Sequence, residues 1–480
     1  MNIQLTLRIL GALLLFLAAA LLTPIPFALY FDDGGTIPLL WSAGITFACG
    51  LILFLLCRSD RDLSAREGFA IVTFGWLFYA VFGALPFVIS GAIPSPLDAV
   101  FETMSGFTTT GASILTDIEG LPESLLLWRA LTHWLGGMGI IVMSLAILPM
   151  LGVGGMQLFK AEVPGPTADR LKPRIQDTAK LLWGVYVILT ALETILLMFG
   201  GMTLHEALCH SFATLATGGF SSRNASVAAY NSAYIDWVIT LFMFLAGMNF
   251  SLHYQALRGR FGSVHRNEEL RVYLGITLVA ILALVVFNFG GVYDSLADNL
   301  RYSAFQVVSI MTTTGFATAD YEVWPIIGQY LLVFLMFIGG CAGSTGGGMK
   351  VARILLLFKH AHVQLFRLIH PRAIRLVKLG NTPVDREVMQ SILGFFALFM
   401  GVFVVASFLM AASGMDLVSA GASVIATLSN IGPGLGTVGP TDNYAHIAPF
   451  GKSVLILCML LGRLELFTVL VLIFPTFWRK

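Results

Sequence analysis

Long apolar stretches, separated by short polar ones, cover most of the chain. Each is about 20 residues or longer, the length that an α-helix needs to cross a bilayer, and none alternates strictly as a barrel strand would. The pattern therefore predicts ten membrane-spanning helices. They fall at about residues 5–31, 37–57, 68–90, 125–151, 181–201, 234–256, 272–292, 326–358, 389–412 and 450–474.

Four further apolar segments are too short to span a membrane, and each lies between two of the last eight stretches. We expect these segments to be re-entrant half-helices, at 97–110, 204–217, 301–314 and 418–431. A non-helical loop at membrane depth is tolerated only where it is buried in protein or faces water, a condition that four loops around one pore would meet. The predicted divisions are a two-helix segment at 1–62 and four repeats at 63–155, 156–260, 261–360 and 361–480.

Composition agrees with an all-α integral membrane protein. Hydrophobic residues make up 57% of the 480 residues and charged residues only 11%, whereas a soluble domain carries roughly 25% charged residues. Of the 28 Lys and Arg, 22 lie at 58–67, 152–180, 257–271, 350–386 and 479–480. The positive-inside rule therefore predicts that these segments and both termini are cytoplasmic. The net charge of +1 gives no indication of nucleic-acid binding.

The opposite, outer side carries few basic residues and many carboxylates. A negative vestibule would concentrate cations at the mouth of a pore, although ordinary solvated loops would account for the same residues. The basic residues on this side are Arg129, Arg223, Arg301 and Lys452. The carboxylates include Asp32, Asp98, Asp117, Glu119, Asp320 and Asp442.

A short glycine-containing segment follows each predicted half-helix. Four such segments at a period near 100 residues indicate four copies of one unit around an axis. Glycine allows backbone torsions that a Cβ forbids, and carbonyl oxygens along a narrow path can replace the water shell of a monovalent cation. The segments are Thr109-Thr110-Gly111-Ala112, Ala216-Thr217-Gly218-Gly219, Thr313-Thr314-Gly315-Phe316 and Asn430-Ile431-Gly432-Pro433.

With these segments, the whole chain resembles the Trk/Ktr/HKT superfamily of potassium transporters. The family folds as four M1–pore-loop–M2 repeats around a central pore, and the two extra N-terminal helices resemble the TrkH-like membrane subunit of Trk-type potassium uptake systems. The resemblance implies a potassium filter whose glycines are Gly111, Gly218, Gly315 and Gly432. Serine at the first of these positions accompanies sodium preference in the family, so Gly111 implies potassium. The fourth segment departs most from the family pattern.

A second motif, at 339–350, interrupts the stretch that follows the third filter segment. Its glycines each destabilise a helix by roughly 1 kcal/mol relative to alanine, so we expect the helix to break and the freed backbone to line a cavity. The resemblance implies a gate beneath the filter, formed by Gly343, Ser344, Thr345, Gly346, Gly347 and Gly348. Two alternatives are close helix packing on Gly339, Gly343 and Gly347 and a phosphate-binding loop, which the misplaced Lys350 disfavours.

Arg463 lies about 11 residues from the end of the last apolar stretch, too deep to reach the membrane surface. A charge there is costly unless it faces water or a partner. We therefore expect Arg463 to face the pore or the glycine-rich motif, and the resemblance implies a positive barrier below the filter. The alternative is a structural ion pair with another helix, for which Glu193 is one possible partner.

Two other patterns bear on ligands and partners. His205 and His210 stand five residues apart, which places them on different helix faces and disfavours a zinc site. The basic segment between Lys359 and Glu387 would attract anionic lipid headgroups or dock a soluble partner. The resemblance implies a cytosolic TrkA-type nucleotide-binding ring, through which alone ATP, ADP or NAD would act, and a homodimer.

The sequence thus predicts a potassium uptake protein of the bacterial inner membrane, with K⁺ as the transported ion and no enzymatic activity. A potassium symporter driven by protons or sodium is the alternative mechanism. A membrane-embedded protease would need paired catalytic groups at one depth, and the spanning stretches contain no aspartate pair.

Overall fold

The computed structural model describes residues 2–57, 65–146, 171–373, 375–380 and 382–478. In these ranges the chain forms helices joined by loops, and its one β-sheet is a small antiparallel hairpin, in which β1 (Lys378–Leu379) pairs with β2 (Thr382–Pro383). The predicted all-α class is confirmed. The predicted basic loops at 58–67 and 152–180, and the repeat boundaries at 62 and 155, lie wholly or largely outside the described residues.

The helices follow the order that the apolar pattern predicts. The N-terminal segment contains α1 (Ile3–Ala20), α2 (Ile25–Phe31) and α3 (Thr36–Leu56). The first repeat contains α4 (Ala65–Gly83), α5 (Leu85–Ile89), α6 (Pro96–Phe107) and α7 (Glu123–Ala146). The second contains α9 (Leu171–Phe199), α10 (Leu204–Leu215), η3 (Ser226–Tyr230), α11 (Ala233–Ala246) and α12 (Phe250–Leu257).

The other two repeats follow the same plan, with additional breaks. The third contains α13 (Phe261–Arg266), α14 (Glu268–Asn288), α15 (Leu296–Met311), η4 (Tyr321–Val323), α16 (Ile326–Met336) and α17 (Val351–Ile369). The fourth contains α18 (Arg386–Ala412), α19 (Leu417–Leu428), η5 (Gly436–Val438), α20 (Pro449–Arg463), α21 (Phe467–Leu470), η6 (Val471–Ile473) and α22 (Pro475–Trp478).

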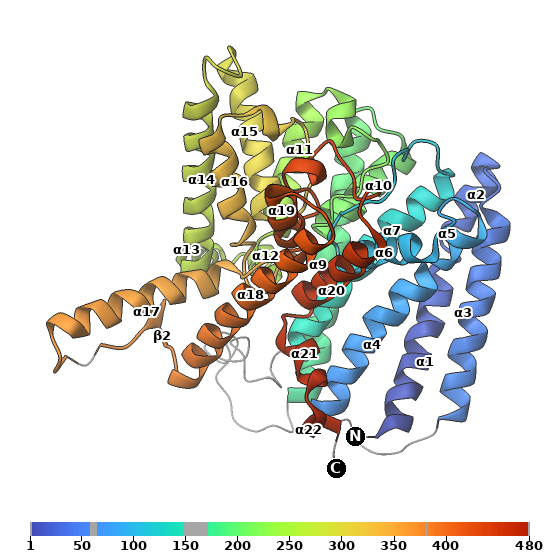
Figure 1. Cartoon of the computed structure of the whole chain (residues 1–480), viewed down its shortest axis with the longest axis horizontal. Coiled ribbons are helices and arrows are strands. Elements are labelled where there is room, and N and C mark those ends of the chain that lie inside the picture. Colours follow the sequence, from blue (N-terminus) through green and yellow to red (C-terminus); the bar gives the residue numbers. More distant parts are fainter. Residues whose placement is uncertain (1, 58–64, 147–170, 374, 381, 479–480) are drawn as a thin grey trace.

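The four predicted half-helices are present as α6, α10, α15 and α19. Each begins at a side chain that accepts a hydrogen bond from a backbone N–H of the first turn, which is the usual way to satisfy a helix N-terminus. These capping residues are Ser95, Thr203, Ser295 and Asp416. The four half-helices come together in the upper half of the molecule, away from the end where α1 starts and α22 ends (Figure 1).

The spanning helices depart from the predicted continuous runs in the second half of the repeats. Among the described residues, six helices are long and apolar enough to cross a membrane alone. Two predicted runs are instead bent pairs: α11 and α12 meet at 102°, and α20 and the segment Phe467–Ile473 meet at 112°. The run at 326–358 breaks, as predicted, between α16 and α17; we call residues 337–350 the inner loop.

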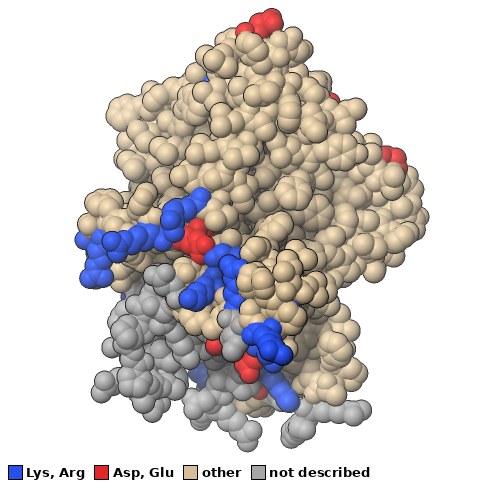
Figure 2. Space-filling model, turned by 90° about the vertical axis from the view of Figure 1, so that its left-hand side faces the viewer, with Lys and Arg blue, Asp and Glu red and all other residues tan. Residues whose placement is uncertain are grey.

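The outer surface of the helices is that of an integral membrane protein. In the most apolar windows of α14 and α18, only 22% of the residues are buried inside the molecule, and side chains such as Val286 and Phe408 are more than 70% exposed. Figure 2 shows Lys and Arg gathered in the lower part of one face, below a belt that is almost free of charge. An apolar belt of this kind fits a lipid environment.

Candidate functional site

The four glycine turns, which we now define as 109–111, 217–219, 313–315 and 430–432, share one backbone conformation. Their first residues have positive φ angles: Thr109 (50°), Thr217 (54°), Thr313 (61°) and Asn430 (54°). Their third residues are left-handed glycines: Gly111 (83°), Gly219 (78°), Gly315 (83°) and Gly432 (98°). A left-handed β-branched residue is uncommon and strained, so three such threonines in matching places mark a specialised structure.

This geometry corrects the expected register of the second turn. The sequence pointed to Gly218 as the counterpart of the other three glycines, but the structure matches Gly219 with them. Gly218 takes the second place, which Thr110, Thr314 and Ile431 occupy in the other turns. Two consecutive glycines left this register undetermined in the sequence.

A shared hydrogen bond closes each half-helix at its turn. The backbone N–H of the second turn residue donates to the carbonyl five residues earlier, which is a common C-terminal closure of helices. The distances from nitrogen to oxygen are 2.8 Å for Thr110 to Ser105, 2.8 Å for Gly218 to Ala213, 2.8 Å for Thr314 to Ser309 and 2.7 Å for Ile431 to Ala426. The fourth turn, which departs most in sequence, therefore keeps the geometry of the others.

The turns also contact one another in a closed order. A Cβ added to the third residue of any turn would lie closer than 3.0 Å to the carbonyl oxygen of the second residue of the next turn. The pairs are Gly111 with Gly218, Gly219 with Thr314, Gly315 with Ile431 and Gly432 with Thr110. The fourth turn thus returns to the first, so the four turns surround one axis in chain order. Only glycine permits this approach.

Side-chain hydroxyl and amide groups stabilise three of the turns by hydrogen bonds. The hydroxyls of Thr108 and Thr110 lie 2.8 Å apart, and those of Thr312 and Thr314 also lie 2.8 Å apart. In the fourth turn, Nδ2 of Asn430 donates to Oγ1 of Thr110 at 2.9 Å, and to a backbone carbonyl of α20 at 3.0 Å. Asn430 therefore joins the fourth turn to the first.

A buried ion pair behind the first turn was missed by the sequence reasoning. Nε of Arg129 lies 2.6 Å from Oε1 of Glu102, and both side chains are almost fully buried. Glu102 also accepts from the backbone N–H of Ile114 at 2.9 Å, so it ties the half-helix to the chain after the turn. The polar residues His210 and Gln306, at the same distance before their turns, make corresponding bonds. A polar residue seven positions before the first residue of each of these three turns is the sequence pattern from which such a contact could have been predicted.

All four basic residues of the predicted outer side are paired with carboxylates. Besides Arg129, these are Arg223 with Glu206 at 2.7 Å, Arg301 with Asp298 at 3.0 Å and Lys452 with Asp98 at 2.6 Å. Paired cations add little positive potential to this side. Each pair neutralises its carboxylate as well, Asp98 among them, so a net negative potential on this side would have to come from the carboxylates outside these pairs.

The inner loop lies against the C-terminal ends of three half-helices, α10, α15 and α19. Oγ1 of Thr345 donates to the carbonyl of Leu215 at 2.9 Å, and the backbone N–H of Gly347 donates to Oγ1 of Thr313 at 2.6 Å. The same glycine packs on the carbonyl of Ser429. Because residues 337–350 are not helical, the alternative of a packed helix ladder on their glycines does not apply.

Arg463 is the last residue of α20 and is 2% exposed. Its Nη1 donates to the carbonyl of Thr345 at 2.7 Å and its Nη2 to the carbonyl of Gly136 at 3.0 Å. The expectation that Arg463 faces the glycine-rich motif is therefore confirmed, and Glu193 does not pair with it among the described residues. Nearby, Lys350 donates to the carbonyl of Gly346, and Arg353 pairs with Glu465; sequence reasoning had not singled out these partners.

The histidines that suggested a metal are occupied by protein groups. Nδ1 of His205 lies 3.0 Å from a carboxylate oxygen of Glu123, and Nδ1 of His210 lies 2.8 Å from the carbonyl of Glu206. Within the described ranges, no group of three or more metal-ligating side chains could hold a metal ion.

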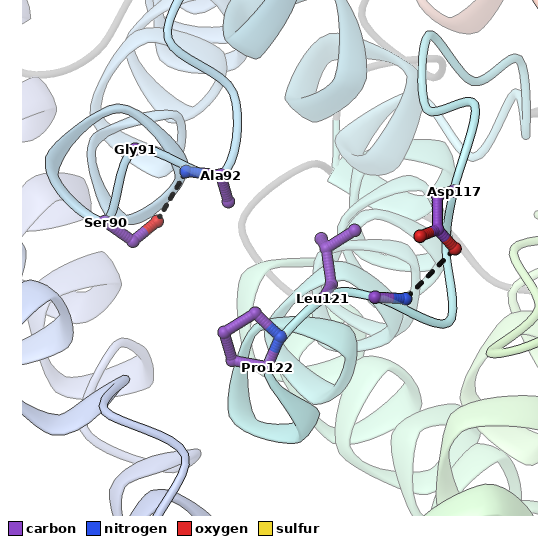
Figure 3. Close-up of a pocket in the computed structure, with 7 residues that line it drawn as sticks. Ser90, Gly91, Ala92, Asp117, Leu121 and Pro122 are labelled. Carbon is purple, nitrogen blue, oxygen red and sulfur yellow. Dashed lines mark hydrogen bonds between the residues drawn. The ribbon is translucent and has the colours of Figure 1, made fainter.

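A surface pocket of about 310 Å³ shares no lining residue with the glycine turns or the inner loop. It is lined by residues 90–92 and by Asp117, Gly120, Leu121 and Pro122 (Figure 3). Its dashed hydrogen bonds, from Ala92 to Ser90 and from Gly120 to Asp117, are local turns.

Comparison with known proteins places this arrangement in a family. A family model described as a cation transport protein, TrkH, matches residues 42–480. The Trk system potassium uptake protein TrkH of Salmonella typhimurium is 46% identical over 98% of this chain and 99% of its own length, and that of Escherichia coli K12 is 45% identical over the same shares. The crystal structure of the potassium transporter TrkH from Vibrio parahaemolyticus covers 100% of both chains with a TM-score of 0.91 at 39% identity. The chain belongs to the TrkH family of cation transport proteins.

Proposed function

We propose that this protein conducts potassium ions into the cell as the membrane subunit of a Trk-type uptake system. Its full-length relatives are named potassium uptake proteins. The observation that carries the proposal is the closed ring of four turns, in which each third-position glycine meets the carbonyl of the next turn. Carbonyl oxygens around one axis can replace the hydration shell of K⁺.

In this proposal the ring is the selectivity filter. The half-helices end at the turns, and the C-terminal ends of four helices together direct partial negative charge toward the axis, which favours a cation. Gly111 at the first glycine position fits potassium preference. The filter residues are Thr109, Thr110, Gly111, Thr217, Gly218, Gly219, Thr313, Thr314, Gly315, Asn430, Ile431 and Gly432, with Ala216 directly before the second turn.

The inner loop is the gate of this proposed pathway. It presses on the half-helix ends through Thr345 and Gly347, directly next to the turns. Arg463 holds it by one hydrogen bond and brings a positive charge to the same place. A fixed positive charge in a low-dielectric region raises the energy of a passing cation, so Arg463 acts both as a latch and as a barrier.

The regulatory partner would act on the opposite end from the turns. The segment from α17 to β2 carries the exposed residues Arg367, Arg372 and Arg375. Figure 2 shows Lys and Arg gathered in the lower part of one face. We propose that this end is cytoplasmic in the bacterial inner membrane and that a TrkA-type ring docks there, bringing any nucleotide control. Anionic lipids are the competing ligand of the basic segment, and a homodimer remains part of the proposal.

Purified protein in liposomes tests this function directly. Flux should be high for potassium and rubidium and low for sodium and lithium, and the partner ring with its nucleotides should change the flux but not the order of ions. Equal sodium and potassium flux would refute the proposed filter. Flux that follows a pH gradient at fixed voltage would instead favour the symporter mechanism.

A further inference from the structure

Gly218 is a glycine for a different reason from its neighbours in the ring. Its φ angle does not lie in the left-handed region, and the equivalent residues are two threonines and an isoleucine. The backbone there accepts a side chain, yet a Cβ on Gly218 would lie closer than 3.0 Å to three atoms of the His133 imidazole. His133 thus occupies the space in which the second turn would otherwise have its own side chain.

The imidazole is held in place by packing. His133 lies on α7 and is fully buried, and its ring stacks on Phe220 with centroids 4.0 Å apart and an interplanar angle of 15°. The guanidinium carbon of Arg129, one helical turn before His133, lies 3.5 Å from the centroid of the same Phe220 ring. Neither ring nitrogen of His133 has a hydrogen-bond partner of ordinary geometry among the described residues, and the backbone of Ser105 is the polar group that interacts with the ring. The position of the imidazole therefore depends mainly on packing.

The second turn lacks the support that the first and third turns possess. In those turns a threonine pair, Thr108 with Thr110 and Thr312 with Thr314, joins the end of the half-helix to the turn through hydroxyls 2.8 Å apart. The corresponding residues of the second repeat are Ala216 and Gly218, which have no hydroxyl. Something other than the turn itself must fix it.

We propose that His133 is a positioning residue for ion selection, and that its imidazole, supplied by α7 of the first repeat, serves as the missing side chain of the second turn. This inference rests on the proposed role of the turns as a filter. One of the four turns then depends on His133, a residue 85 positions before Gly218 in the sequence. Through this contact, α7 of the first repeat would couple the first and second repeats in ion selection.

Reciprocal variants test the proposal. Gly218→Ala should place its Cβ against the imidazole and lower both the melting temperature in detergent and the potassium-to-sodium flux ratio. His133→Ala should leave a void behind the turn and lower the flux ratio by about tenfold, equivalent to about 1.4 kcal/mol. The double variant should recover much of the melting temperature and of the flux ratio. The Cβ that Gly218→Ala adds would occupy part of the void that His133→Ala leaves, and it would no longer meet an imidazole. His133→Asn keeps a planar group at this position, so its flux ratio should lie between those of the wild type and His133→Ala.

Two controls make the result specific. Gly219→Ala should not be rescued by His133→Ala, because its Cβ would meet the carbonyl of Thr314 and its φ angle is 78°. His253→Ala removes a largely buried imidazole from α12 and should leave the flux ratio unchanged. Purely additive effects of the Gly218 and His133 substitutions would overturn the proposal. If the double variant recovers its melting temperature while none of the variants alters ion selectivity, the packing is correct but the turns are not the filter.

Discussion

Nη1 of Arg463 donates a 2.7 Å hydrogen bond to the carbonyl oxygen of Thr345, and this bond joins the end of α20 to the middle of the inner loop. The hydroxyl of Thr345 in turn donates to the carbonyl of Leu215, the last residue of the half-helix α10. A short chain of bonds therefore runs from the fourth repeat through the loop to the second glycine turn. A movement of α20 would therefore displace the inner loop and, through the bond to Leu215, the end of the second half-helix.

Replacing Arg463 by alanine should increase potassium flux, because the change removes both the latch on the loop and the positive charge. Lysine should retain more of the barrier than glutamine does, since it keeps the charge but loses the pair of hydrogen bonds. Flux from liposomes and melting in detergent should be measured on the same preparations. A variant that melts much earlier and conducts no better would show that Arg463 is only structural.

Shortening the inner loop by several residues within 343–348 should also raise flux, because it removes the backbone that presses on the half-helix ends. The potassium-to-sodium ratio should change less than the flux, because the deletion removes the contact of Gly347 with Thr313 but no residue of the turns themselves. Thr345→Val is the matched variant without a change of length: it removes the hydrogen bond to the carbonyl of Leu215 and should raise flux less. Unchanged flux in a well-expressed deletion would contradict a gating role.

Much of this architecture was predictable because hydropathy reports length and burial. The half-helices, the break at 337–350 and the direction of Arg463 toward the loop all follow from apolar patterns or from the cost of a buried charge. The bends of α11–α12 and α20–α21 were not predictable, because a few residues change direction inside a continuous apolar run. At the second bend, Glu465 and Leu466 adopt φ angles of 57° and 53° without any glycine.

The register of the second turn and the role of Arg129 were hidden for different reasons. Gly218 and Gly219 are identical in sequence, and only their torsions and neighbours tell them apart. The distribution of basic residues assigns Arg129 to the outer side, and it gives no sign of the buried partner, Glu102, which lies on another helix. Contacts between helices decide such cases, and a single sequence does not encode them as a local pattern.

Gly219→Ser and Gly111→Ser should have the same effect on ion selectivity. In both places the side chain would meet the carbonyl oxygen of the next turn, Thr314 or Gly218, and the residue would be held at a positive φ angle. We expect relative sodium permeation to rise for Gly111→Ser and for Gly219→Ser, measured as the ratio of sodium to potassium flux. If Gly219→Ser retained full selectivity, the structural match of Gly219 with Gly111 would have no functional meaning.

The buried Arg129–Glu102 pair should be essential to stability, because removing either charge leaves the other one buried without its partner. Breaking a buried pair leaves an uncompensated charge and costs roughly 3–5 kcal/mol, so Glu102→Gln and Arg129→Met should each lower the melting temperature in detergent strongly. The double variant Glu102→Gln with Arg129→Met should lose less than the sum of the two, because no unpaired charge remains.

Asp298→Asn provides the comparison for this pair. The side chain of Asp298 is 50% exposed, and its partner Arg301 also lies 3.5 Å from Asp236. Exposed ion pairs contribute about 0–1 kcal/mol, so this variant should melt close to the wild type. If Glu102→Gln melts no earlier than Asp298→Asn, the guanidinium of Arg129 must be stabilised without the carboxylate. Its hydrogen bond to the carbonyl of Ser221 at 2.9 Å and its contact with Phe220 would then be sufficient.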